Sequence, residues 1–226
     1  MRKFYHENSL SIITFAIFFL LWAAMGIAGF FSYNNEQLEQ GQSTASFISY
    51  FTTGHFWEAT FENWESEFLQ MGFFVILTAF LYQKGSAESK TKEEHEEEQQ
   101  EEENEEKGEG ESKDAPPWPV RRGGFIRKLY ENSLSITLLL IFVLCFIFHA
   151  FSGVRNYNAE QAYFGQPPIT IWKFFITSDF WFQSFQNWQS EFLAVGAMVV
   201  LTIFLRQKGS AESKSVGAPS GKTGES

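Results

Sequence analysis

Cysteine is almost absent from this chain, with Cys145 as the only one among 226 residues. A single thiol excludes an intramolecular disulfide and any metal centre held by several cysteines. Basic residues are also scarce: 17 Lys and Arg stand against 27 Asp and Glu, a net charge of −10. An acidic chain without a basic patch is not expected to bind nucleic acid.

Motifs of common enzymes are missing as well. The chain has no glycine-rich phosphate loop, no His-Glu-x-x-His helix and no Gly-x-Ser-x-Gly turn. These patterns carry phosphate binding, zinc hydrolysis and serine catalysis in many enzymes. We therefore expect a protein that is not an enzyme and has no cofactor.

Acidic residues are concentrated in one segment, since residues 88–114 hold 14 of the 27. This segment has almost no apolar side chains and cannot bury enough surface to offset the entropy of ordering. We predict that residues 91–124 form a disordered acidic linker and that residues 215–226 form a disordered tail.

Long apolar runs dominate the rest of the chain. Residues 10–31 carry no charge over 22 positions, and residues 134–153 form a second such run. At about 1.5 Å per residue, each run spans a hydrocarbon core of about 30 Å. Two shorter runs, 68–82 and 192–205, become long enough if their helices begin near Trp64 and Trp188 at the interface that Trp favours. The pattern predicts an all-α membrane protein with four transmembrane helices.

The distribution of basic residues predicts the topology of these four spans. Fifteen Lys and Arg precede the first span, lie between the second and third, or follow the fourth, whereas two lie in the other loops. Positively charged loops stay on the cytoplasmic side. We therefore expect a multi-pass protein of the cell (inner or plasma) membrane with both termini and the acidic linker in the cytoplasm. The lipid bilayer is the expected partner.

The chain also repeats itself at a fixed offset of 124 residues. Residues 8–90 and 132–214 are identical at 40 of 83 aligned positions, including eight consecutive residues at the end of each copy. Such similarity indicates a duplicated unit. Because each unit crosses the membrane twice, the two copies form parallel repeats, which we place at residues 1–90 and 125–214.

Aromatic side chains recur at helical spacing in both outer loops. Spacings of three, four and seven residues place most of them on one helical face, among them Tyr50, Trp57 and Phe61 in the first loop and Trp172, Trp181 and Phe185 in the second. A helix with one aromatic face beside a span lies flat at the membrane interface. We therefore predict amphipathic, aromatic-rich interfacial helices in both loops.

One polar motif stands at the head of the second span of each copy. It is Asn-Trp-x-Ser-Glu-Phe-Leu, and it contributes Asn63, Ser66, Glu67, Asn187, Ser190 and Glu191. One interpretation is structural: Asn or Ser caps the helix, and Glu in the first turn complements the helix dipole. The other is an ion or proton site, because acidic residues within a membrane are commonly functional.

The repeated motifs carry a resemblance to a known family. Tyr-Asn-x-Glu-Gln followed by Gly-Gln, the Asn-Trp-x-Ser-Glu-Phe-Leu heads and the Gln-Lys-Gly-Ser-Ala-Glu-Ser-Lys tails resemble a family of bacterial integral membrane proteins known only as a domain of unknown function. The resemblance covers nearly the whole chain except the acidic linker. It implies a bacterial membrane protein and transfers no catalytic residues.

Two functions are compatible with these features. The first is a non-catalytic structural, interaction or envelope-stress membrane protein that associates with itself or with another membrane protein. The second is a small transporter or channel for protons or small ions that uses Glu67 and Glu191.

Overall fold

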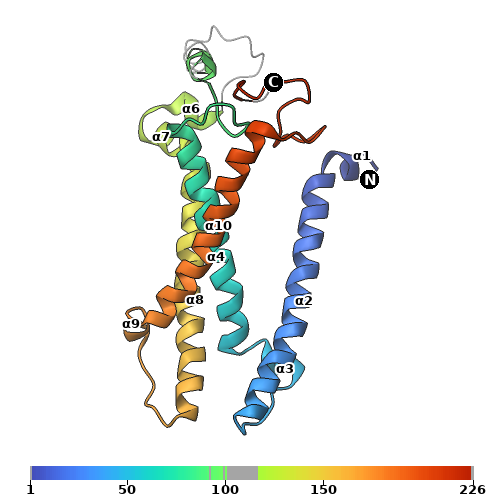
Figure 1. Ribbon diagram of the computed structural model, residues 1–226. Coiled ribbons are helices and arrows are strands. Elements are labelled where there is room, and N and C mark those ends of the chain that lie inside the picture. The colour runs from blue at the N-terminus through green and yellow to red at the C-terminus, as the bar shows by residue number, and fades with distance from the viewer. Residues whose placement is uncertain (1, 92, 99, 101–116, 225–226) are drawn as a thin grey trace. The chain divides into compact units, whose positions relative to one another are not determined.

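The computed structural model describes residues 2–91, 93–98, 100 and 117–224. Every regular element in these ranges is a helix, and no strand occurs among them (Figure 1). The expected all-helical fold is therefore confirmed for these ranges. Residues 101–116 of the predicted disordered linker lie outside the described residues, whereas residues 93–98 are helical.

The helices follow one another in two similar series. In chain order they are α1 (Arg2–Glu7), α2 (Ser9–Glu39), α3 (Phe47–Tyr50), α4 (Gly54–Phe80), α6 (Trp118–Arg122), α7 (Gly124–Glu131), α8 (Ser133–Tyr163), α9 (Ile171–Phe174) and α10 (Ser178–Phe204). α2 and α8 each have 31 residues, α3 and α9 have 4, and α4 and α10 have 27. α8, α9 and α10 begin 124 positions after α2, α3 and α4, respectively.

Three helices, α2, α8 and α10, are long and apolar enough to cross a membrane. α4 has the length of α10 but is more acidic, because Glu58, Glu62 and Glu65 stand where α10 has Phe182, Gln186 and Gln189. Both α4 and α10 also begin ten residues earlier than the predicted starts at Trp64 and Trp188. The interfacial Trp residues therefore lie within these helices, not at their beginnings.

The loop helices are shorter than the aromatic pattern predicts, because α3 and α9 each make a single turn. At the start of α3, the Ser46 hydroxyl accepts a hydrogen bond from the backbone N–H of Ser49. At the start of α9, the Thr170 hydroxyl accepts one from the backbone N–H of Lys173. After each turn the chain enters a long helix at once. The aromatic side chains of each loop therefore divide between a one-turn helix and the first turns of α4 or α10.

The chain divides into two compact units, and the division falls within α4, α8 and α10. The first unit comprises Met1–Glu62 and Phe146–Trp181, and the second comprises Asn63–Cys145 and Phe182–Ser226. In the first unit, Tyr50 packs on α2 so closely that a Cβ atom at Gly29 would lie 2.2 Å from its hydroxyl. In the second, α4 approaches α8 at Gly72, where a Cβ atom would lie 3.0 Å from Leu139 Cδ2. Glycine therefore permits close helix packing in both units.

Candidate functional site

The six polar residues of the repeated motif all belong to the second unit, on α4 and α10. The Glu67 side chain is exposed and that of Glu191 is half-buried. The two carboxylates are close enough to interact electrostatically.

The helix-capping interpretation of this motif is wrong. Glu67 is the fourteenth residue of α4, and Glu191 is the fourteenth of α10. The dipole effect on a side chain falls off within the first turn. The hydroxyls do not cap either: Ser66 donates to the Asn63 carbonyl at 2.8 Å, and Ser190 donates to the Asn187 carbonyl at the same distance.

A third carboxylate of this unit, Glu65, was not singled out by the sequence. Its side chain is fully buried, and its Oε1 accepts a hydrogen bond of 2.8 Å from Nε1 of Trp188. The Cys145 thiol on α8 is also within electrostatic range of Glu65. A buried charge is costly unless it is paired or hydrogen-bonded. The bond to Trp188 therefore couples this carboxylate to the packing of α4 against α10.

One polar atom near Trp188 has no hydrogen-bond partner within the part of the chain that the structure describes. It is the hydroxyl of Ser184, whose side chain is buried. Ser184 lies one turn before Trp188 on α10, so both residues belong to the same helix face. An unsatisfied hydroxyl inside a protein costs free energy, which makes this face a candidate position for a small polar ligand or a water molecule.

The first unit holds two further buried titratable side chains. Glu58 on α4 lies against α8, where a Cβ atom at Gly153 would be 2.9 Å from its Oε1. His149 on α8 has no exposed surface and stacks on Phe180, with ring centroids 4.9 Å apart. The burial of His149 depends on its packing against Phe180 in the fold.

The first unit also contains a histidine–tyrosine pair. The Tyr50 hydroxyl and His55 Nδ1 are 3.1 Å apart and hydrogen-bonded. Burial lowers the pKa of His55, and the charge of Glu36 opposes this shift. Burial also raises the pKa of Tyr50 to about 12, with smaller contributions from Glu36 and Tyr33. The pair is therefore neutral near pH 7.

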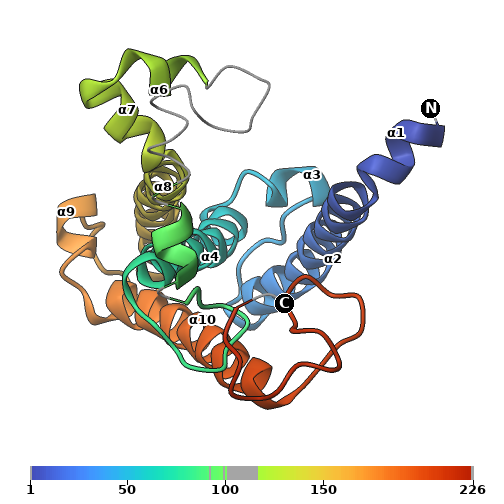
Figure 2. The same ribbon diagram turned by 90° about the horizontal axis from the view of Figure 1, so that it is seen from above.

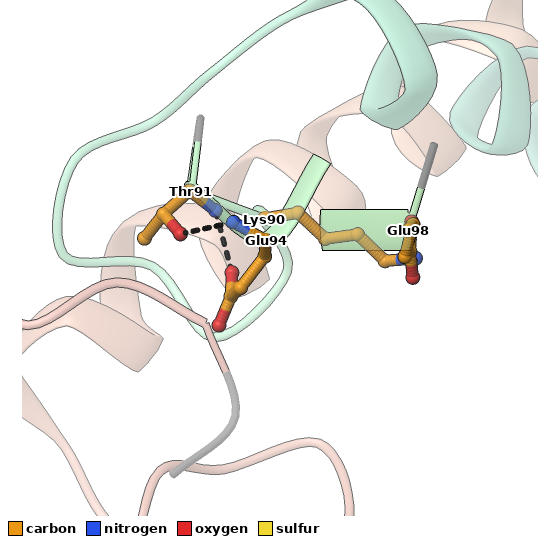
Figure 3. A network of polar contacts seen from close by, with 4 residues as sticks. All are labelled: Lys90, Thr91, Glu94 and Glu98. Atoms are coloured by element: carbon orange, nitrogen blue, oxygen red, sulfur yellow. Dashed lines mark hydrogen bonds and ion pairs between the residues drawn. The ribbon is translucent and has the colours of Figure 1, made fainter. Parts of the chain in front are cut away.

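The second unit also contains an acidic cavity of about 840 Å³. Thr91 and Glu94 beside it form a capping box: the Glu94 N–H donates to Thr91 Oγ1 at 3.1 Å, and Glu94 Oε2 accepts from the Thr91 N–H at 2.6 Å (Figure 3). Lys90 pairs with Glu98 at 2.5 Å. The capping box explains why residues 93–98 are helical despite their charge. No group of three His, Cys, Asp or Glu side chains among the described residues is arranged to hold a metal ion.

Comparison with known proteins identifies a family but no activity. The model of the family described as Domain of unknown function (DUF6766) matches residues 1–225. Because the match covers nearly the whole chain, the protein belongs to this family. No curated protein and no solved structure matches the chain.

Proposed function

Starting from membership of this family, we propose that the chain is a non-catalytic integral membrane protein that crosses the bilayer four times. Three of the spans are α2, α8 and α10, and α4 is the fourth. The 27 residues of α4 exceed the length that a hydrocarbon core of about 30 Å requires. Glu58 and Glu65, two of the acids that make α4 polar, are buried inside the protein. Intramembrane acids are tolerated when they face the protein interior.

The proposal includes a duplication of one two-helix unit. Equivalent hydrogen bonds at an offset of 124 residues support it. The Asn34 side chain bonds both backbone groups of Ala45, as Asn158 does with Ile169. With four spans, the bias of Lys and Arg places both termini and the acidic segment in the cytoplasm of the bacterial cell.

The observation that carries the proposed role is the apolar exterior of α2. Large apolar side chains are exposed along its first three turns and beyond, namely Leu10, Ile13, Phe15, Ile17, Phe19, Leu20, Leu21, Ile27 and Phe31. A surface of this kind is stable against lipid or against another transmembrane helix. We therefore propose a structural or interaction role in the envelope, including its response to stress, through self-association or contact with another membrane protein.

The test of this role combines extraction, association and flux. The protein should stay in membranes washed with alkaline carbonate, and differently tagged copies should co-purify in mild detergent. Proteoliposomes should show no flux of protons, Na⁺ or K⁺ beyond that of protein-free liposomes. Release by carbonate would contradict the membrane assignment, and protein-dependent flux would contradict the non-catalytic, non-transporting role.

A second candidate function has its own observation. Glu67 and Glu191 interact electrostatically, and neither serves as a helix cap. Two carboxylates in one helical unit can share a proton or bind a small cation. This supports a small transporter or channel in which Asn63, Ser66, Asn187 and Ser190 supply neighbouring polar groups.

Substitution distinguishes the two candidates if any flux is found. Glu67→Gln and Glu191→Gln should each abolish the flux while leaving expression intact, and the double variant should be no worse than either single one. Glu39→Gln, a change at an exposed residue near the end of α2, is the matched control. Flux that persists in the double variant would remove the transport role of this pair.

A further inference from the structure

We propose that α6 and α7 together form a binding surface for the headgroups of anionic phospholipids. This inference rests on the membrane-spanning role of α8 proposed above. The surface is defined by Trp118, Arg121 and Arg122 of α6 and by Phe125 and Lys128 of α7. All five side chains are exposed.

The position of α7 places this surface at the edge of the bilayer. α7 ends at Glu131 and α8 begins at Ser133, so one residue separates a short helix from a helix apolar enough to span. At that break, Asn132 Nδ2 donates to the Lys128 carbonyl at 2.9 Å. Figure 2 shows α6 and α7 as separate short helices at the end of α8. α7 therefore adjoins the end of the helix by which the chain is proposed to enter the hydrocarbon.

The apolar side chains of the surface fit an interfacial location. Phe125 is 79% exposed and Trp118 is 56% exposed. Leu129, one turn after Phe125 on α7, is also exposed. A short amphipathic helix with exposed aromatic residues buries them at the boundary between headgroups and acyl chains.

The basic side chains give the surface its preference for negative charge. Arg121, Arg122 and Lys128 are exposed, and the Arg122 guanidinium lies 5.3 Å from the Trp118 ring centroid. A fourth base, Arg127, forms an ion pair with Glu131 at 2.5 Å. Glu131 is the one acidic residue of α7, so its charge is already balanced within the helix. Guanidinium groups match the geometry of a phosphate. Arg121, Arg122 and Lys128 therefore remain as three exposed positive groups on α6 and α7.

The equivalent helix of the first copy shows what is specific to this surface. α1 has the ion pair Lys3–Glu7, 124 positions before Arg127–Glu131, and the same asparagine bond, from Asn8 to the Phe4 carbonyl. These shared bonds belong to α1 and α7 alone, whereas Arg121 and Arg122 belong to α6. α6 thus supplies both the aromatic ring and the paired guanidinium groups.

The acidic segment of the same chain is the main competing occupant. Its many carboxylates would satisfy the basic residues. It has almost no apolar side chains, however, and so would leave Phe125 and Trp118 exposed to water. A phospholipid offers a phosphate and an apolar region side by side, which is why we assign the surface to lipid.

Native mass spectrometry of the full-length protein in detergent tests the assignment with phosphatidylglycerol and phosphatidylcholine as probes. We expect the protein to retain phosphatidylglycerol in preference to phosphatidylcholine. The triple variant Arg121→Gln, Arg122→Gln, Lys128→Gln should bind it about 100-fold more weakly, because each base near an anionic surface contributes about 1 kcal/mol and 1.4 kcal/mol is a factor of ten. Lys84→Gln, Lys208→Gln, Lys222→Gln removes the same charge from exposed positions elsewhere and should change little.

Several outcomes would overturn the proposal. Equal retention of the two lipids, or unchanged retention by the triple variant, would show that the surface does not select anionic headgroups. Displacement of phosphatidylglycerol by inorganic phosphate would show that charge alone is recognised. Binding that appears only after deletion of residues 93–111 would assign the surface to the acidic segment. Release of the protein from membranes by carbonate would instead contradict the proposed membrane function, so the two failures are distinguishable.

Discussion

Trp188 Nε1 donates a hydrogen bond of 2.8 Å to Oε1 of Glu65, a carboxylate with no exposed surface. The bond joins α10 to α4 within the second unit. In the other copy the equivalent positions are Trp64 and Gln189, and the Gln189 side chain is exposed. The two similar motifs therefore differ at this position, because Glu65 is a buried acid whereas Gln189 is an exposed amide.

The first prediction concerns the loss of this bond. Trp188→Phe keeps an aromatic ring but removes the donor, so the free energy of unfolding should fall by about 1–2 kcal/mol, as expected when a buried acceptor loses its partner. Thermal or denaturant unfolding in detergent measures it. Glu65→Gln retains an acceptor for the Trp188 N–H and should lower the free energy of unfolding by less. In a Glu65→Leu background, which has no acceptor, the Trp188→Phe change should be nearly silent, and additive losses would show that the two residues do not interact.

The second prediction concerns pH and the histidine–tyrosine pair. Because burial lowers the pKa of folded His55, the unfolded chain takes up a proton first as the pH falls. Stability should therefore decrease as the pH falls from about 7 to 5. The raised pKa of Tyr50 keeps its phenol protonated throughout, and Glu36 is the neighbour whose charge acts on His55.

His55→Gln is the comparison that isolates this effect. Its stability should vary less with pH than that of the original chain over the same range, as measured by thermal unfolding in detergent. His6→Gln, a change at an exposed residue of α1, should leave the dependence unaltered. An identical slope for His55→Gln and the original chain would place the pH dependence elsewhere.

Apolar length and the duplication predicted the helical class from sequence. Uninterrupted runs such as residues 10–31 leave no alternative to a helix of membrane length. Gly54 and Ser178 mark the breaks between the one-turn loop helices and the long helices α4 and α10. What the sequence did not reveal is that α4 and α10 extend unbroken from those breaks through the Asn-Trp-x-Ser-Glu motif. That continuity removed the capping interpretation.

Burial of individual acids could not be read from the sequence. Glu65 and Glu67 are two residues apart, and the spacing places them on different sides of a helix without saying which side is covered. Which side is covered depends on the packing of α8 and α10, which are more than 60 residues away in the chain. The position equivalent to Glu65 in the second copy holds Gln189, and nothing in that difference reveals that Glu65 is buried and hydrogen-bonded.

The third prediction concerns the segment after α10. Lys214 is buried, and its Nζ donates to the carbonyls of Gly85, Ser220 and Lys222 at 2.5, 3.1 and 2.8 Å. These bonds tie residues 215–224 to the first copy's Gly-Ser-Ala-Glu-Ser segment. Lys214→Met removes all three, so limited proteolysis should cut residues 215–224 much faster than in the original chain.

Lys90 provides the matched control, since it occupies the equivalent position 124 residues earlier. It is exposed and pairs only with Glu98 among the interactions found in the described segments. Surface ion pairs contribute about 0–1 kcal/mol. Lys90→Met should therefore leave the proteolysis of residues 215–224 unchanged. Equal protection in both variants would show that the Lys214 bonds do not hold the segment.

The last prediction distinguishes four spans from three by the accessibility of single cysteines. In a Cys145→Ser background, Gln40→Cys, Gln100→Cys and Gly165→Cys are labelled in intact cells with a membrane-impermeant maleimide. If α4 crosses the membrane, residues 40 and 165 lie outside and residue 100 lies inside. If only α2, α8 and α10 cross, residues 40 and 100 share one side and residue 165 lies on the other.

The four-span arrangement is expected because it alone places Arg155 and Lys173 outside and the other fifteen bases inside. Labelling of residues 40 and 100 alike, with residue 165 on the other side, would assign α4 to a buried but non-spanning helix, and its four acids would then need no shelter from lipid.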